Sequence, residues 1–144
     1  MPADGLVIDI KVELAEMKVA FGVASLSFEG DLPAAIFHMG LVVRDSASWK
    51  ITPDVVVVFH TNAGHVTLND DSYNRDRNIT TGNPYKTLVN ELMDKGVHVE
   101  LCGATAAAHG WKNADTMAGI KINTDAMSRL TQLAQQGYVL MAEA

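Results

Sequence analysis

The sequence of 144 residues contains a single cysteine, Cys102, and only 6% aromatic residues. One cysteine excludes an internal disulfide and a metal site built from several thiolates. The net charge of −6, with no cluster of basic residues, argues against nucleic acid or an anionic membrane surface as a partner. No apolar run reaches the roughly 18 residues that a membrane-spanning helix requires, so we expect no membrane insertion.

The signatures of several enzyme classes are also missing. The sequence has no GxSxG nucleophile motif, no Walker A loop and no GxGxxG dinucleotide motif, and nothing in it points to a cofactor. The first residues lack the basic head and uninterrupted apolar core of a signal peptide. We therefore expect a cytoplasmic protein, or a periplasmic one if a leader has been removed.

The composition that remains is that of a globular domain, with 48% hydrophobic and 19% charged residues. The nearly continuous apolar segments Lys18–Ala24 and Asp54–Phe59 predict strands buried on both faces. Segments with helical periodicity alternate with the strands, as in Pro84–Lys95. This alternation predicts one α/β domain over residues 1–144, a three-layer α/β/α sandwich with a mostly parallel sheet of about five strands.

The N-terminal extension, residues 1–16, precedes a core that we place at about residues 17–141. Apolar and charged residues alternate along it, which predicts an extra strand with one solvent-exposed face. Such a strand could lie at a sheet edge, in a hairpin or at an oligomer contact. The alternating residues are Ile8, Asp9, Ile10, Lys11, Val12, Glu13 and Leu14.

Two further segments predict local features. Asp31 is placed to cap a helix that has Pro33 in its first turn. The long irregular segment His60–Asn83 is rich in Asn, Asp, Gly and Thr, which is typical of a functional lid or of disorder. We expect a short helix around Val66–Tyr73 within it. Near the C-terminus, Thr124 or Asp125 is expected to cap the last helix.

Cys102 lies between a predicted strand, Val97–Leu101, and a predicted helix, Ala104–His109, with Gly103 at the turn. A thiol at the N-terminal end of a helix is exposed to the positive end of the helix dipole, which favours the thiolate. The same position also suits a small buried hydrophobic residue, because free cysteine is among the most buried residue types. The residues alone leave both interpretations open.

His60 follows the strand Asp54–Phe59 and is expected to share an edge of the sheet with Cys102. Its imidazole could stabilise the thiolate or move its proton, or it could simply cap the strand through a hydrogen bond. His65 and His109 could join them as zinc ligands, but their spacing fits no zinc pattern, and we predict no metal. The other residues expected to line a pocket at this edge are Asn62, Asn83, Tyr85, Gly103, Ala104, His109 and Trp111.

Several pieces of the sequence together form a recognisable pattern. They are Asn83-Pro84-Tyr85 at the start of a helix, Leu92–Val97, Val99–Gly103, Ile120–Ile122 and Leu133–Tyr138, with Val55–His60 upstream. In this pattern the chain resembles the DsrE/DsrF-like family, which has the YchN-like fold. The resemblance covers roughly Met17–Met141, and its most specific piece is GV-x-V-E-L-C-G, which ends in Cys102 and Gly103.

The resemblance implies a three-layer α/β protein that assembles into trimers or hexamers. It also implies an intracellular sulfur carrier, in which Cys102 holds sulfur as a persulfide and exchanges it with donor and acceptor proteins. The alternative is a non-catalytic oligomeric subunit that binds a small ligand or a partner, with Cys102 as a buried structural residue. The extra N-terminal strand has no counterpart in the resemblance.

Overall fold

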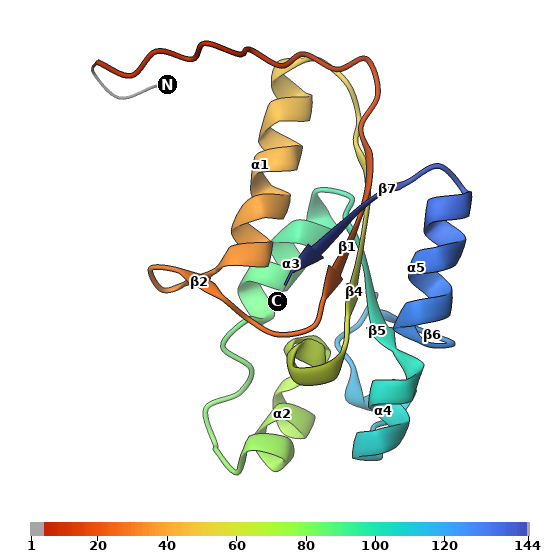
Figure 1. Cartoon of the computed structure of the whole chain (residues 1–144). Coiled ribbons are helices and arrows are strands. Elements are labelled where there is room, and N and C mark those ends of the chain that lie inside the picture. Colours follow the sequence, from red (N-terminus) through yellow and green to blue (C-terminus); the bar gives the residue numbers. More distant parts are fainter. Residues whose placement is uncertain (1–4, 144) are drawn as a thin grey trace.

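The fold is built on one five-stranded parallel sheet (Figure 1). The computed structural model describes residues 5–143. The strand order is β6-β5-β4-β1-β7, and every pairing between neighbours is parallel. The strands are β1 (Lys18–Val23), β4 (Asp54–Phe59), β5 (His98–Cys102), β6 (Lys121–Asn123) and β7 (Val139–Glu143). The predicted α/β class and sheet are confirmed.

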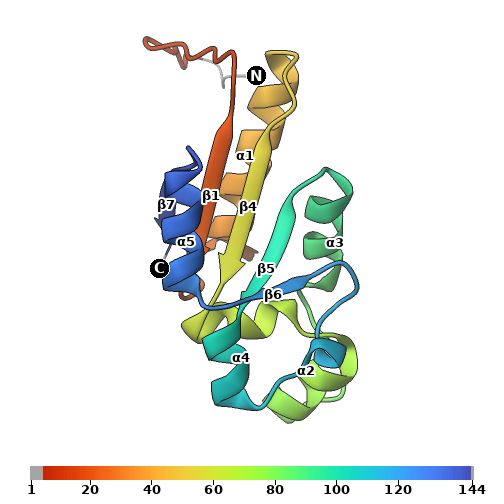
Figure 2. The same cartoon turned by 90° about the vertical axis from the view of Figure 1, so that its right-hand side faces the viewer.

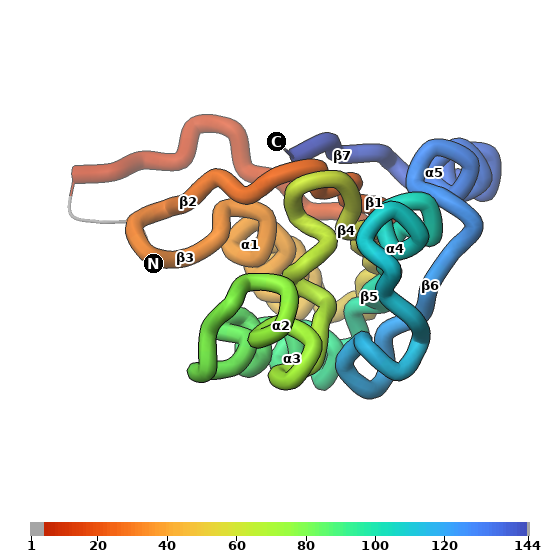
Figure 3. The backbone as a smooth tube through the Cα atoms, turned by 90° about the horizontal axis from the view of Figure 1, so that it is seen from below, coloured from red at the N-terminus to blue at the C-terminus, as the bar shows by residue number. Residues whose placement is uncertain are grey.

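Helices cover both faces of the sheet and its C-terminal end. Figure 2 shows α1 and α3 on one face and α5 on the other, while Figure 3 looks onto the end where α2 and α4 lie. No helix within residues 5–143 is long and apolar enough to cross a membrane. The α-helices are α1 (Ala34–Ser48), α2 (Asp70–Arg77), α3 (Lys86–Asp94), α4 (Gly103–His109) and α5 (Ala126–Gln135), and the short 3₁₀ helices are η1 (Thr61–Thr67) and η2 (Asn113–Asp115).

The central strands β1 and β4 supply side chains to both faces, because successive residues of a strand point in opposite directions. On the side of α1 and α3, alternate residues such as Phe21, Val57 and Phe59 join a large apolar cluster. On the side of α5, the residues between them, such as Val56 and Val58, join a smaller cluster that includes Cys102. The continuous apolar runs that predicted buried strands therefore serve two separate cores.

The N-terminal extension differs from the prediction. Residues 5–17 contain no strand, and the apolar side chains between Leu6 and Leu14 are exposed. β1 already has β4 on one side and β7 on the other, so a hairpin partner finds no free edge beside it. The extra strand predicted here is absent from the described part of the chain. Alternation of apolar and charged residues does not form a strand by itself, because the backbone also needs a neighbouring strand to pair with.

The segment before α1 also differs. Phe28–Glu29 (β2) pairs antiparallel with Leu32–Pro33 (β3) around a turn in which Gly30 has a φ of +62°. α1 begins directly after Pro33 without a side-chain cap, so the predicted capping role of Asp31 is wrong. Instead, the backbone N–H of Ala34, the first residue of α1, donates to the Ser27 carbonyl at 2.7 Å.

The long segment after β4 is ordered into η1 and α2. The helix expected around Val66–Tyr73 lies a few residues later, because the Asn69 side chain caps α2 by accepting a hydrogen bond from the Ser72 N–H at 2.9 Å. At the other end of the chain, the predicted cap is confirmed: the Asp125 carboxylate accepts from the Ser128 N–H at 2.8 Å at the start of α5.

Candidate functional site

Cys102 is the last residue of β5 and the residue that precedes α4. Its side chain points to the α5 face of the sheet and packs in the smaller apolar cluster, with 4% of the residue exposed. The sequence predicted both the position at the strand end and the adjoining helix. The structure adds that the thiol lies beneath the first turn of α5.

The Cys102 sulfur accepts hydrogen bonds from the starts of two helices. The N–H of Ala126, at the start of α5, lies 3.2 Å from Sγ. From α4, the backbone N–H groups of Ala104 and Thr105 and the Thr105 hydroxyl also donate to it. Burial raises the pKa of the Cys102 thiol, but these donors together outweigh burial and leave the pKa below its ordinary value. The site therefore favours a thiolate inside an otherwise apolar surrounding.

Gly103 allows the two helix starts to meet at the sulfur. A Cβ atom at this position would lie 2.3 Å from the Asn123 carbonyl oxygen and 2.7 Å from that of Thr124. These are backbone atoms and cannot turn aside as a side chain would. Glycine is thus required for the close approach of the β5–α4 turn to the β6–α5 turn.

His60 follows β4, and Cys102 ends β5, one residue beyond the last registered pair of the two strands, Phe59 and Leu101. The two residues therefore lie at the same level of the sheet, as predicted. No direct hydrogen bond joins them in the described structure: His60 Nδ1 lies 2.9 Å from the Thr61 hydroxyl. Partial burial lowers the pKa of His60, so its neutral form is favoured.

Thr61 and Thr105 connect the His60 end of β4 to the sulfur. The Thr61 N–H donates to the Thr105 hydroxyl at 3.0 Å, and this hydroxyl donates in turn to Cys102 Sγ. Thr61 has a φ of 53°, a left-handed conformation that is strained for a β-branched residue. The strained backbone thus holds one end of the hydrogen-bonded chain that reaches the thiol.

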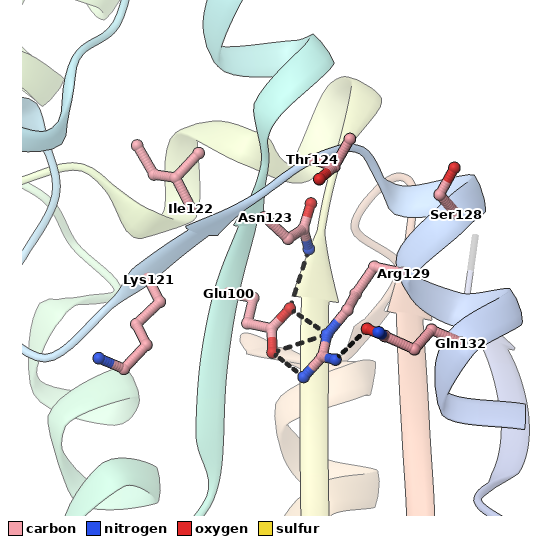
Figure 4. Close-up of a pocket in the computed structure, with 8 residues that line it drawn as sticks. All are labelled: Glu100, Lys121, Ile122, Asn123, Thr124, Ser128, Arg129 and Gln132. Atoms are coloured by element: carbon pink, nitrogen blue, oxygen red, sulfur yellow. Dashed lines mark hydrogen bonds and ion pairs between the residues drawn. The ribbon is translucent and has the colours of Figure 1, made fainter. Parts of the chain in front are cut away.

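A partly buried ion pair joins Arg129 to Glu100, which lies two residues before Cys102 on the same face of β5 (Figure 4). Arg129 of α5 binds the Glu100 carboxylate with two nitrogens, at 2.9 Å from Nε to Oε1 and 2.8 Å from Nη2 to Oε2. Asn123 Nδ2 adds a third donor at 2.9 Å from Oε1. The pair ties α5 to β5 and β6, and so holds in place the helix whose first turn covers the thiol.

A hollow of about 450 Å³ adjoins this ion pair (Figure 4). It is lined by Asn123 at the end of β6, Thr124 of the β6–α5 turn and Ser128 of the first turn of α5, which covers Cys102. The Oδ1 atom of Asn123 is buried and has no hydrogen-bond partner among the described residues. The hollow lies on the outer side of the segment that separates the thiol from solvent.

Two of the predicted pocket residues hold the loops together. The buried Asn83 side chain donates to the Val66 and Leu68 carbonyls at 2.9 and 2.7 Å, and accepts from the Tyr85 N–H at 2.8 Å. The Tyr85 ring packs edge-on against His65, at 6.1 Å between centroids. Burial, followed by the charge of Arg77, lowers the pKa of His65 to about 4.

The remaining predicted residues lie at the rim. His109 and Trp111 stack with their rings 4.2 Å apart and, together with Asn62, line a hollow of about 270 Å³ beyond the strand ends. Ala104 is exposed apart from the N–H that it directs to Cys102. Within residues 5–143, no three His, Cys, Asp or Glu side chains are grouped so that they could hold a metal ion.

The sequence prediction missed Thr105, Glu100 and Arg129. Glu100 carried a signal, because a carboxylate inside an apolar strand, on the same face as Cys102, requires a buried partner. Arg129 could not be identified from the sequence, since its contact depends on how α5 lies across β5.

Comparison with known proteins supports the fold. No match is found among curated proteins. The structure is similar to that of MTH1491 from Methanobacterium thermoautotrophicum, a protein of unknown function, with a TM-score of 0.67, 17% identity and coverage of 88% of this chain and 99% of that one. It is also similar to the ychN protein from E. coli, with a TM-score of 0.58, 17% identity and the same coverage.

The sequence comparison goes further than the structural one. The profile of the DsrE/DsrF-like family matches residues 17–142, which include all five strands of the sheet apart from the last residue of β7. The chain therefore belongs to the DsrE/DsrF-like family.

Proposed function

We propose that the protein carries sulfane sulfur on Cys102 as a persulfide. The observation that supports this most is the convergence of N–H groups from the starts of α4 and α5 on one sulfur atom, which lowers the pKa of the thiol. A thiolate is the nucleophile in sulfur transfer, and family membership makes sulfur relay a natural hypothesis.

The transfer step is a displacement at sulfur. The Cys102 thiolate attacks the outer sulfur of a donor persulfide R–S–SH, so that a new S–S bond forms on Cys102 while the donor S–S bond breaks and R–S⁻ leaves with the bonding electrons. The transferred sulfur keeps its proton or loses it to water. An acceptor thiolate then attacks this outer sulfur and restores the Cys102 thiolate.

The N–H donors suit both states of the cysteine. They stabilise negative charge on the thiolate before transfer and again when Cys102 becomes the leaving group. The chain has no second cysteine, so it cannot resolve the persulfide as an internal disulfide. The proposal therefore includes separate donor and acceptor proteins. Family membership motivates its other part, a homo-oligomer, trimer or hexamer, as the assembly.

Access to the sulfur requires a local opening. With 4% of Cys102 exposed, a donor persulfide reaches the thiol only if the first turn of α5 moves away from β5. The hollow lined by Asn123, Thr124 and Ser128 lies where such an opening would lead. His60, with its pKa lowered, is available as a neutral base or hydrogen-bond partner at the rim once the site is open.

Burial also favours a second candidate function, an oligomeric ligand-binding or interaction subunit in which Cys102 is a structural residue. In that case Cys102 serves as a small side chain that fits the apolar cluster around it, and ligands bind at the rim. The two functions differ in whether the native thiol reacts.

Intact-mass spectrometry separates them. Native protein is incubated with a low-molecular-weight persulfide donor, and its mass is measured before and after dithiothreitol, with Cys102→Ser as the control. A reversible gain of one sulfur atom, absent from Cys102→Ser, is the result expected for a carrier. No adduct, with a thiol that reacts only in denaturant, would assign Cys102 to the core and leave the second function.

A further inference from the structure

The segment from Leu6 to Leu14 has the properties of a strand but pairs with nothing in its own chain. Its even-numbered residues from Ile8 to Leu14 are apolar and the residues between them are charged, so one face of the extended segment is apolar. All of these apolar side chains are exposed, up to 84% for Ile10. No backbone hydrogen bond links residues 5–16 to the rest of the described chain. We call residues 6–14 the arm.

The outer edge of β7 has the complementary property. β7 pairs with β1 on one side only, so its backbone N–H and C=O groups on the other side are unpaired within residues 5–143. Its side chains are also exposed, with Val139 at 60% and Met141 at 41%. An apolar edge strand of this kind is normally covered, because it otherwise pairs with other chains.

The arm cannot reach the β7 edge of its own chain by a simple connection. Residues 15–17 lead directly into β1, which lies between β4 and β7, so the arm would have to cross over one of these strands. Strands that follow each other in sequence are neighbours in a sheet about two times in three, so this arrangement would be the less common one. Figure 1 shows the arm leaving the sheet at the start of β1 and extending past the end of α1, away from the body of the domain.

We propose that the arm of one copy adds as a strand to the outer edge of β7 in a second copy. The arm's apolar face then continues the layer formed by Val139 and Met141, which lie on the α1 side of the sheet because they pair with Val19 and Phe21 of the large cluster. The polar face, with Asp9, Lys11 and Glu13, stays in solvent. Pairing through the backbone supplies affinity, and the alternating side chains fix the register.

The contact is limited by β7, which has five residues and spans roughly 17 Å. Two reciprocal contacts about 10 Å wide would bury on the order of 700 Å² in total, which is less than a specific interface needs by itself. The occupant is a second copy of this chain, and the arm adds to the other contacts of the homo-oligomer proposed above.

The first test is the mass of the full chain in solution, measured by light scattering across a dilution series. The wild type is expected to form a dimer or a larger closed assembly. Ile10→Lys places a charge in the centre of the apolar face and is expected to weaken association by about tenfold or more. The control Lys11→Gln changes a residue on the polar, solvent-exposed face of the arm and should leave the mass unchanged. A monomeric wild type, or an Ile10→Lys variant that associates as tightly as the wild type, would overturn the proposal.

A second test reports which chains the arm joins. In a Cys102→Ala background, Ile10→Cys and Met141→Cys are combined and treated with a short bismaleimide, which tolerates a small error in register. The expected product is a covalent dimer or a larger covalent ring. A cross-link confined to single chains would show that the arm folds back on its own β7, and this result would also overturn the proposal. Neither test depends on the chemistry of Cys102.

Discussion

The two faces of the sheet have different compositions. Toward α1 and α3 lies a large apolar cluster, which includes Phe21, Phe59 and Met39. Toward α5 lies a small one, built mainly from Ala20, Val56, Val58 and Cys102, and it gives way to the Glu100–Arg129 ion pair at β5. One face is thus suited to stability. The other combines a thiol, a partly buried charge pair and a single covering helix, and the candidate chemistry lies there.

The largest effect is expected at Gly103, where the α5 face is most closely packed. Gly103→Ala places a Cβ atom against the Asn123 and Thr124 carbonyls, and the turns must separate. We expect the free energy of unfolding to fall by about 3 kcal/mol or more, as for severe overpacking. Urea unfolding followed by circular dichroism measures this.

The matched control is Gly40→Ala on the other face. Gly40 lies inside α1, and a Cβ atom there meets no other atom within 4 Å. Alanine has the higher helix propensity, so this variant is expected to gain about 0.5–1 kcal/mol. If both substitutions changed stability equally, the close approach at Gly103 would not be the constraint that we infer.

A second comparison uses two neighbouring residues of β4. Val57 and Val58 are both fully buried, but Val57 points into the large cluster and Val58 into the small one. Val57→Ala is expected to lower the free energy of unfolding by about 2–3 kcal/mol, and Val58→Ala by roughly half as much, because fewer atoms surround the cavity on that face. Chemical denaturation of the pair tests this, and a larger loss for Val58→Ala would contradict the division of stability between the faces.

The sequence predicted local features of both faces of the sheet. Four consecutive valines located β4 to the residue, since β-branched residues without alternation suit a strand buried on both faces. The strand end at Cys102 and the helix beyond it were likewise correct. These features depend on residues that are neighbours in the sequence, so the sequence alone is enough to predict them.

Features that depend on pairing were not predictable in the same way. The alternation from Ile8 to Leu14 predicted a strand, but a strand requires a partner edge, and the chain's own sheet offers none beside β1. The Glu100–Arg129 pair joins residues that are 29 positions apart, and only the placement of α5 brings them together. The turn of β2 and β3 was missed because the strands have two residues each and leave no periodicity to detect.

The ion pair on the α5 face provides a third comparison. Glu100→Gln removes the charge that Arg129 binds while keeping the size of the side chain. We expect a loss of about 2 kcal/mol, because Arg129 is left partly buried without a counter-charge. We also expect Cys102 to react several-fold faster with iodoacetamide, since α5 is held less tightly over the thiol.

The control for this variant is Glu91→Gln in α3, an exposed position on the opposite face. It should change neither stability nor the alkylation rate. If Glu100→Gln lost stability but left the alkylation rate unchanged, the ion pair would support the fold without controlling access to the thiol.

The smallest change in stability, and the most direct measure of the thiol, is expected from Thr105→Val. Valine keeps the shape of threonine but removes the hydroxyl that donates to Cys102 Sγ, so the pKa of the thiol should rise. The pH profile of native alkylation would move to higher pH. Thr67→Val is the control, because its hydroxyl donates to the Gly64 carbonyl at 2.8 Å and does not contact the sulfur.

The same shift links Cys102 to stability. Its native pKa lies below the ordinary value of 9.0, so between the two values the unfolded chain binds more protons than the native one. The native state therefore gains stability as the pH rises across this interval, and loses the gain as the pH falls through the native pKa. The gain should shrink in Thr105→Val and vanish in Cys102→Ser. A pH dependence that is unchanged in Cys102→Ser would mean that another group produces it and that the N–H donors do not hold a thiolate.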